Sequence, residues 1–351
     1  MPNSPASARL AIRLHDDAVR IGPLTIHFHR TLRLPDDGRS YPLPPSLGRF
    51  PLHRVADHAD RVPESWRGDG GVFIPMHQRE ALWLGFGGRA DDPVALKVAA
   101  GMRNALTGEA WDERIEAGRD QDYVVVPGQP WLDGFNSGTG VIRQFIAMPL
   151  GMGYTAEGQL SGEETFGGIQ LVAFRAREGA IPPAPEWGES VVCEALALPA
   201  PPAYSPSDGV VAASASHGRV QGPGAEMGLA AGGRMRQDIH PDEHGPDVWD
   251  TRRAGRLFVH IVDAGMYQQI TGRPAPATPI SAQTYADHGL PWFEEYSGAG
   301  DIAPSDALAG LRSVAEKDAE HGFTLQDDGS VEVPEHLVTR VPPPSFSDPV
   351  S

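Results

Sequence analysis

The stretch "GVIRQFIAMPLGMGYTAEGQ", residues 140–159, combines a high apolar content with four long polar side chains. These are Arg143, Gln144, Glu157 and Gln159. We predict a β-hairpin here, because apolar runs flank the turn-forming letters PLGMG. The polar side chains either face solvent or line a site, since a polar group left unpaired inside a protein costs roughly 1–3 kcal/mol.

The predicted hairpin has strands over residues 141–148 and 154–160, and a third strand follows at 169–174. Successive side chains of a strand point to opposite faces, and both faces of residues 141–148 are mostly apolar. That pattern is typical of a strand buried on both sides. At least one of Arg143 and Gln144 therefore needs a partner inside the protein.

The composition of the whole chain favours strands and loops over long helices. The 351 residues include 41 glycines and 34 prolines, which together exceed a fifth of the chain. Both residue types interrupt helices and serve turns. We therefore predict a mainly β or α+β fold, with a sandwich-like antiparallel β unit and a smaller α+β unit that carries a C-terminal helix.

Composition changes along the chain indicate where these units begin and end. A β-rich domain is predicted over residues 8–179 and is followed by a Pro/Ala/Gly-rich linker or long loop over 180–225. The smaller α+β unit is predicted over 226–340, with an acidic helix at 305–321. Residues 341–351 are expected to form a tail.

Charge, cysteine content and hydropathy exclude several classes of protein. The net charge of −17 disfavours nucleic acid as a partner, because a polyanion needs a basic surface. Cys193 is the only cysteine, so no disulfide can form within the chain. No run of 18 apolar residues predicts a transmembrane helix, and no secretory signal is visible. We expect a cytoplasmic protein without a cofactor.

Two histidine-containing motifs could in principle bind a metal. "HPDEH", residues 240–244, matches the H-x-x-E-H pattern of one metallopeptidase class. Gly245 and Pro246 follow at once, so at most one helical turn can form there. His240, Glu243 and His244 are therefore weak candidates, and we expect a polar surface turn without metal.

The second motif is "IHFHR", which places His27 and His29 on the same face of a predicted strand. Two imidazoles at this spacing can chelate a metal. Asp16 and Asp17 are the carboxylates specified nearby, and we expect both histidines on a solvent-exposed strand face without metal.

Polar residues inside apolar segments are the main candidates for a ligand site. The hairpin contributes four of them, and "RMRQD" contributes Arg234, Arg236, Gln237 and Asp238. If both segments meet at a seam between the two units, these side chains could bind a small polar ligand, since crevices between units commonly host sites. The alternative is a buried ion-pair network that fixes the packing of the units.

Four stretches of the chain carry a resemblance to a known family. They are "RTLRLPDDGRSYPLPPSLGRFPL", "QPWLDGF…GVIRQFIAMPLGMGYTAEGQLSGEETFGGIQL", "MGLAAGGRMRQDI" and "TGRPAPATPISAQTYADHGLPWFEEY". Over most of residues 20–297 the chain resembles an uncharacterised family of bacterial and fungal proteins, some of which are loosely labelled "integral membrane protein". The resemblance implies no activity, cofactor or catalytic residue.

Two functional hypotheses follow from these observations. The first is a non-catalytic cytoplasmic binding, scaffold or assembly protein, whose embedded polar residues are satisfied within the fold. Its partner would be a small molecule or a protein, and it could form a homo-oligomer. The alternative is a hydrolase-like small-molecule enzyme. It predicts a pocket at the seam where Arg143, Glu157, Arg236 and Asp238 converge with a histidine.

Overall fold

The computed structural model describes residues 9–181, 226–278, 281–295, 300–323 and 330–341. The predicted linker at 180–225, with Cys193, and the predicted tail at 341–351 lie almost entirely outside the described residues.

The fold is mainly β with short helices, as the composition predicts. The strands are β1 (Ile12–His15), β2 (Ala18–Ile21), β3 (Leu24–Thr31), β4 (Ser40–Tyr41), β5 (His53–Arg54), β6 (Val72–Pro75), β7 (Ala81–Gly87), β8 (Val94–Ala100), β9 (Arg103–Asn104), β10 (Val124–Val126), β11 (Trp131–Leu132), β12 (Gly134–Gly138), β13 (Val141–Pro149), β14 (Ile169–Ala176), β15 (Glu226–Arg236), β16 (Trp249–Val262), β17 (Trp292–Glu295) and β18 (Val338–Val341). The helices are α1 (Glu64–Asp69), α2 (Ala156–Ser161), α3 (Ala264–Thr271), α4 (Ala282–Asp287), α5 (Asp306–Ala309) and α6 (Val314–Glu320), with 3-10 turns η1 (Val55–His58), η2 (Pro246–Val248) and η4 (Glu335–Leu337). None of the helices in the described ranges is long and apolar enough to cross a membrane.

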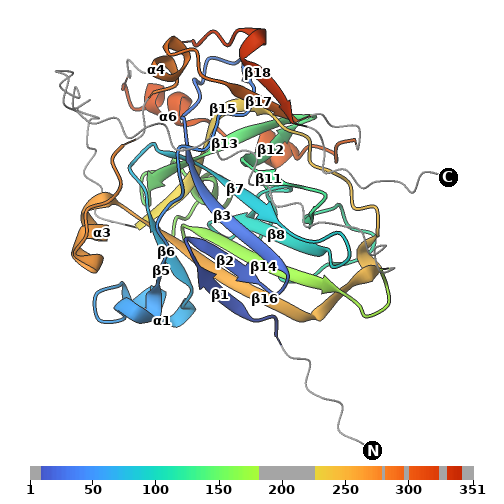
Figure 1. Ribbon diagram of the computed structural model, residues 1–351. Coiled ribbons are helices and arrows are strands. Elements are labelled where there is room, and N and C mark those ends of the chain that lie inside the picture. The colour runs from blue at the N-terminus through green and yellow to red at the C-terminus, as the bar shows by residue number, and fades with distance from the viewer. Residues whose placement is uncertain (1–8, 182–225, 279–280, 296–299, 324–329, 342–351) are drawn as a thin grey trace, which may run out of the picture.

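One large sheet organises the described residues. Its strands follow the order β1-β2-β3-β7-β13-β15-β16-β14-β8-β10, and neighbours along this path are antiparallel. Leu10 N–H donates to the Ala254 carbonyl at 3.2 Å, so the β1 edge curls back toward β16. Figure 1 shows α1 and α3 beside β5 and β6, whereas α4, α6 and the parallel β17–β18 pair gather at the opposite end of the sheet.

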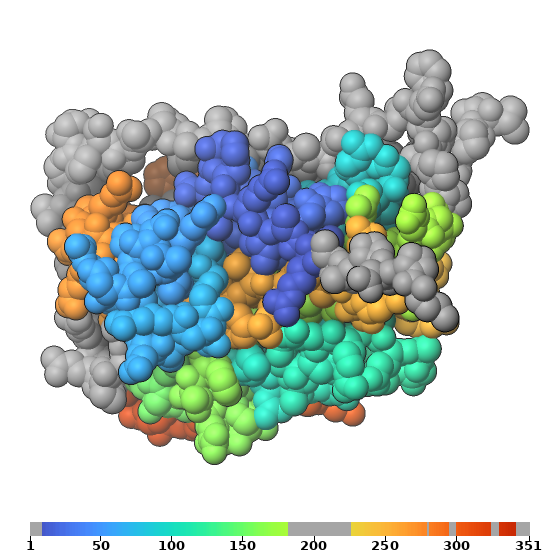
Figure 2. Space-filling view, turned by 90° about the horizontal axis from the view of Figure 1, so that it is seen from below, coloured from blue at the N-terminus to red at the C-terminus, as the bar shows by residue number. Residues whose placement is uncertain are grey.

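Strands from both sides of residues 182–225 share this sheet. β15 pairs with β13 from Val141↔Arg236 to Pro149↔Met227, and β16 pairs with β14. β16 also pairs with β6, and on the face shown in Figure 2 the segment around α1 lies against residues of β16 and α3. The boundary predicted at 180–225 therefore does not separate two sheets.

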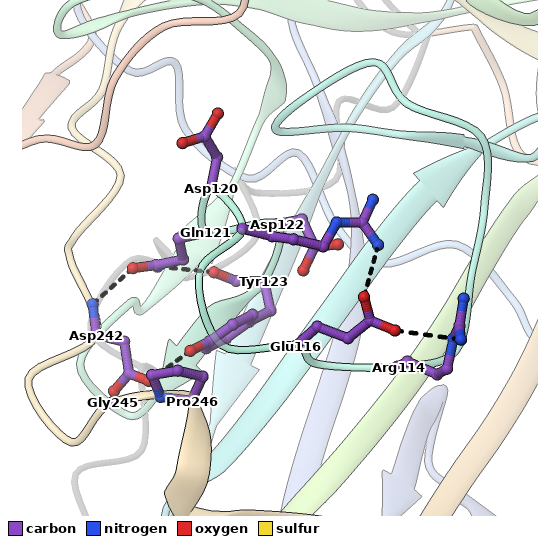
Figure 3. A pocket seen from close by; sticks show the side chains of 10 residues that line it. Arg114, Glu116, Asp120, Gln121, Asp122, Tyr123, Asp242, Gly245 and Pro246 are labelled. Atoms are coloured by element: carbon purple, nitrogen blue, oxygen red, sulfur yellow. Dashed lines mark hydrogen bonds and ion pairs between the residues drawn. The ribbon is translucent and has the colours of Figure 1, made fainter.

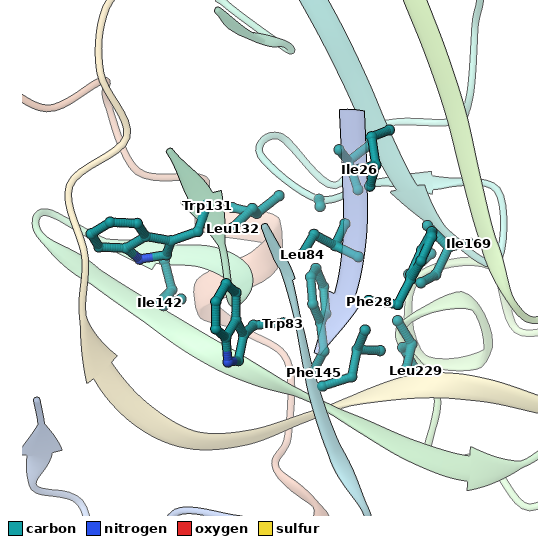
Figure 4. Close-up of a cluster of buried hydrophobic side chains, with 14 of the residues drawn as sticks. Ile26, Phe28, Trp83, Leu84, Trp131, Leu132, Ile142, Phe145, Ile169 and Leu229 are labelled. Atoms are coloured by element: carbon teal, nitrogen blue, oxygen red, sulfur yellow. The ribbon is translucent and has the colours of Figure 1, made fainter. Parts of the chain in front are cut away.

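The largest hydrophobic cluster draws on the same strands. Side chains of β3, β7, β13, β14 and β15 meet in it (Figure 4), and Phe28, Leu84 and Phe145 are at most 1% exposed. Trp292 of β17 and Leu308 of α5 belong to the same cluster. Full burial of each such side chain contributes about 1.5–3 kcal/mol, so the later segments are held by the same core as the sheet.

The return strand predicted over residues 154–160 is wrong, because the chain forms α2 there. The Thr155 side chain accepts a hydrogen bond from Gly158 N–H at 3.1 Å and so caps the first turn. Gly162 ends the helix in the left-handed conformation at φ 80°. The two caps stabilise one and a half turns of helix between β13 and β14.

The helix predicted over residues 305–321 is divided into α5 and α6. Ser305 caps α5, but Ser313 begins a new helix through a capping box with Glu316. Ser313 also forms a parallel bridge with Ala231 of β15. This bridge requires extended backbone at residue 313, so the helix cannot continue through it.

The prediction that His27 and His29 lie on a solvent-exposed face is also wrong. β3 lies between β2 and β7, and His29 is only 4% exposed. Its Nδ1 is 2.8 Å from Ser46 Oγ, and its ring stacks on Trp83 with centroids 3.9 Å apart. Burial, with the nearby His27 and Arg49, lowers the pKa of His29 to about 3, and burial likewise lowers the pKa of His27 to about 4.

These histidines should make the protein sensitive to acid. In the unfolded chain an imidazole protonates near its ordinary pKa of 6.5, whereas the pKa of His29 in the folded protein is about 3. Between these pH values the unfolded state binds one more proton at this position than the folded state. As the pH is lowered, the free energy of unfolding therefore falls by about 1.4 kcal/mol per pH unit for this group. Denaturant titrations at a series of pH values give the free energy of unfolding as a function of pH. In His29→Asn the slope of this function should be smaller by that amount. His15→Asn, at an exposed position, should leave the slope unchanged, and an unaltered slope in His29→Asn would contradict the burial argument.

A second prediction concerns the close approach of β12 to β13. Gly134 pairs with Gln144, and a Cβ atom at residue 134 would lie 1.9 Å from the Arg143 carbonyl oxygen. Gly134→Ala should therefore lower the free energy of unfolding by about 3 kcal/mol or more, since the backbone has to move. The matched control is Gly68→Ala in α1, where a Cβ meets nothing within 4 Å. That substitution should be neutral or stabilising by up to about 1 kcal/mol, and equal losses in urea denaturation would refute the steric explanation.

Candidate functional site

Two predicted ligand residues instead bind the backbone of neighbouring segments. Gln144 is fully buried, accepts a hydrogen bond from the backbone N–H of Leu34 at 2.9 Å, and donates to the carbonyl of Leu32 at 2.8 Å. Gln237 uses its amide in the same way on the backbone of residues 131–133, at 2.8 and 3.2 Å. Both amides thereby satisfy backbone groups that would be costly to bury unpaired.

Glu157 and Gln159 hold loops in a similar manner. The buried Glu157 carboxylate accepts three backbone N–H groups of residues 165–167, at 2.9–3.0 Å. Gln159 accepts from the Arg312 N–H at 2.7 Å and donates to the Arg312 carbonyl at 3.0 Å. These contacts fix the loop after α2 and the segment before α6.

The predicted arginines form separate contacts. The guanidinium of the buried Arg143 lies 3.7 Å from the Glu316 carboxylate, and Arg234, its register partner on β15, is exposed. Arg236 forms a 2.9 Å ion pair with Glu294 of β17.

The convergence required by the enzyme hypothesis is not observed. In the part of the chain that the structure describes, no hydrogen bond or ion pair joins Arg143, Glu157, Arg236 and Asp238 to one another. Asp238 is half-buried, and its carbonyl accepts from Gln129 Nε2 at 3.2 Å. Arg236 lines a hollow on the surface, which is described below.

The HPDEH segment at 240–244 is not helical, and Gly245, with φ 83°, and Pro246 follow it at once. His240 is 9% exposed with Nδ1 2.9 Å from the Gly128 carbonyl oxygen, whereas Glu243 and His244 are exposed. The two imidazoles therefore lie in different environments. No group of three or more His, Cys, Asp or Glu residues within the described ranges is arranged to hold a metal ion.

A small polar cavity of about 120 Å³ lies between residues 114–123 and 242–246 (Figure 3). Tyr123 donates its hydroxyl hydrogen to Asp242 Oδ2 at 2.6 Å, and Trp249 Nε1–H donates to the same oxygen at 2.9 Å. Burial, with the hydrogen bond to Asp242, raises the pKa of the Tyr123 phenol. The volume is well below the roughly 300–1,000 Å³ of typical organic-ligand sites.

Next to this cavity lies Lys97 of β8, which is 1% exposed. Its Nζ is 2.5 Å from Asp112 Oδ1 and 2.7 Å from Asp122 Oδ2, and it donates to the Arg114 carbonyl at 2.8 Å. Burial raises the pKa of Asp122, whereas hydrogen bonds from Lys97 and the Arg114 N–H lower the pKa of Asp112 despite its burial. The ammonium thus ties the loop at 111–122 to the sheet.

A second buried ion pair fastens α6. Arg79, in the β6–β7 turn with left-handed backbone at φ 70°, forms a bidentate pair with Asp318. Tyr154 donates to Asp318 Oδ1 at 2.8 Å, and burial together with this carboxylate raises the pKa of Tyr154 to about 12. Neither Arg79 nor Asp318 stands out in the sequence, but Lys97 could have, since it is one of two lysines and follows the apolar run PVAL.

The larger hollow is a groove with a volume of about 540 Å³. It runs between β4, the end of β15 and the segment that leads into β18. Its lining comprises Arg39, Ser40, Tyr41, Pro42, Arg236, Val331, Glu332, Val333, Pro334, Glu335 and Val338. A volume of this size suits a drug-sized organic ligand.

The floor of the groove is fixed by Tyr41. Its hydroxyl donates to Asp37 Oδ2 at 2.8 Å and accepts from the Val331 N–H at 3.3 Å. Burial, with the Asp37 hydrogen bond, raises the pKa of Tyr41 to about 12. Leu43 and Phe293 exchange backbone hydrogen bonds just beyond it. The groove is therefore built on paired backbone.

Comparison with known proteins adds nothing to this geometry. No protein-family model matches the chain, and neither curated proteins nor solved structures include a significant match.

The two lysines offer a matched test of the buried ion pair. Lys97→Met leaves Asp112 and Asp122 without their ammonium, and removing one partner of a buried pair costs about 3–5 kcal/mol. Lys317→Met removes an i,i+3 partner of the exposed Glu320 and should change the free energy of unfolding far less. Urea denaturation should show this difference, and adding Asp112→Asn and Asp122→Asn to Lys97→Met should recover part of the loss. Equal effects of the two single variants would contradict a structural role for Lys97.

Proposed function

We propose that this protein is a non-catalytic cytoplasmic binding protein whose ligand occupies the groove between Arg39, Arg236 and residues 331–338. The groove itself carries the proposal, because its volume of about 540 Å³ and its mixed lining match those of small-molecule sites. Arg236, which the sequence marks as a candidate ligand residue, lines it.

The chemistry of the lining supports binding over catalysis. Valines and prolines provide apolar contact area, and two guanidinium groups provide charge-assisted hydrogen bonds. The residues that line the groove include no histidine, cysteine or lysine, and their proton-transfer groups are limited to Tyr41 and the carboxylates of Glu332 and Glu335. The Tyr41 hydroxyl is held by Asp37, and its pKa of about 12 lies far above the neutral range that suits a general acid or base.

The hydrogen bonds of the other candidate residues also support binding over catalysis. Gln144, Glu157, Gln159 and Gln237 use their polar atoms on backbone groups. These side chains are therefore committed to holding the fold. A small molecule or a protein segment could fill the groove, and assembly into a homo-oligomer is compatible with it, whereas the net charge of −17 disfavours nucleic acid.

An enzyme remains the second candidate because of the cavity shown in Figure 3. It lies between segments from the two units predicted from sequence, and the pKa of Asp122 beside Lys97 is raised by burial. Perturbed groups next to a cavity are typical of active sites. The binding function is better supported, because Nζ of Lys97 already has three acceptors and the cavity is small.

The proposed site can be tested by filling it. The full chain, its Val333→Trp variant and a Phe323→Trp control would be incubated with the dialysable small-molecule fraction of a bacterial extract and examined by native mass spectrometry. Val333 lines the groove, whereas Phe323 is an exposed side chain outside its lining. We expect a retained small molecule in the wild type and the control that is reduced at least about tenfold in Val333→Trp, since the indole would occupy the site. A retained molecule unaffected by Val333→Trp would place the site elsewhere.

A further inference from the structure

The two walls of the groove carry opposite charges. Arg39 and Arg236 come from the β4–β15 side, and Glu332 and Glu335 come from the segment that leads into β18. Apolar side chains that include Val331, Val333 and Val338 line the same groove. A complementary ligand would have an anionic end, a cationic end and an apolar middle.

The arginines are available to such a ligand. The Arg236 side chain is 46% exposed in its pair with Glu294, and the Arg39 side chain is 61% exposed and 3.7 Å from Asp37. Ion pairs this exposed are weak, so a guanidinium can turn to a ligand carboxylate with little loss. A carboxylate is the group that arginine binds best, through two parallel hydrogen bonds.

We propose that the ligand is a short peptide with free termini. Its carboxylate would bind the Arg39 and Arg236 wall, and its ammonium group would bind the Glu332 and Glu335 wall. A volume of about 540 Å³ would be largely unfilled by a single amino acid, whereas a short peptide fills it and places apolar side chains against the valines. This inference rests on the proposed binding function of the groove and specifies its ligand class.

The test uses the tripeptide Val-Ala-Val and calorimetric titration of the full chain. Four forms are compared: free termini, N-acetylated, C-amidated, and blocked at both ends. We expect the free form to bind and each single block to weaken binding roughly tenfold or more, the effect of losing one charge-assisted contact.

Variants of the two walls then assign each terminus. Replacing Arg39 and Arg236 with Gln should weaken binding of the free and N-acetylated forms, with no further effect on the C-amidated form. Replacing Glu332 and Glu335 with Gln should do the converse. Arg13→Gln, at an exposed position on β1, is the control and should leave every affinity unchanged. Melting temperatures of all variants check that they are folded.

Two outcomes would overturn the inference. The free peptide could fail to bind, or it could bind no better than the doubly blocked form. The binding function of the groove is judged separately by the Val333→Trp experiment. If Val333→Trp excludes a retained small molecule while the peptide fails, the groove is a binding site for another class of ligand. If neither experiment detects ligand in the groove, both proposals fall.

Discussion

The pairing of β13 with β15 is the interaction on which the rest of this structure depends. It joins residues 141–149 to residues 227–236 in the middle of the large sheet. Without it, the strands that follow residue 225 would have no antiparallel partner on that side, and the core would lose the apolar side chains of β15. The groove also depends on this pairing, because β15 positions Arg236 and is the strand to which β4 attaches.

Buried polar side chains bind backbone groups beside the strands of the sheet. Gln144, Gln237 and Glu157 each bind backbone groups of a neighbouring segment. Lys97 and Arg79 fasten the loop at 111–122 and helix α6 through buried ion pairs. Such contacts contribute little net stability, because desolvation offsets them, but breaking one is costly. They therefore specify one arrangement of loops around the sheet.

The same arrangement explains why the groove is preformed. Tyr41 bridges Asp37 and the backbone of Val331, so the wall from β4 and the wall from residues 331–338 are joined at the floor. A ligand would find the floor of the groove already fixed, which reduces the entropy lost on binding. The exposed pair of Arg236 with Glu294 is the adjustable part, since it holds the guanidinium near the groove without burying it.

The sequence by itself determined the fold class and several strands of the sheet. Period-two alternation, apolar runs and frequent Gly and Pro are local properties, so β13 and β14 are predicted well from them. The prediction of secondary structure from such local patterns was wrong at two places. The caps at Thr155 and Gly162 make α2 a helix, and the bridge from Ser313 to Ala231 divides the C-terminal helix. The sequence also marked the embedded polar residues, but only the tertiary structure decided which strands, loops and carboxylates they meet. Hydrogen-bond partners of Gln144, Lys97 and Arg79 lie between 15 and 239 residues away along the chain. No local pattern encodes such distances, because the sheet has to form before these groups can meet.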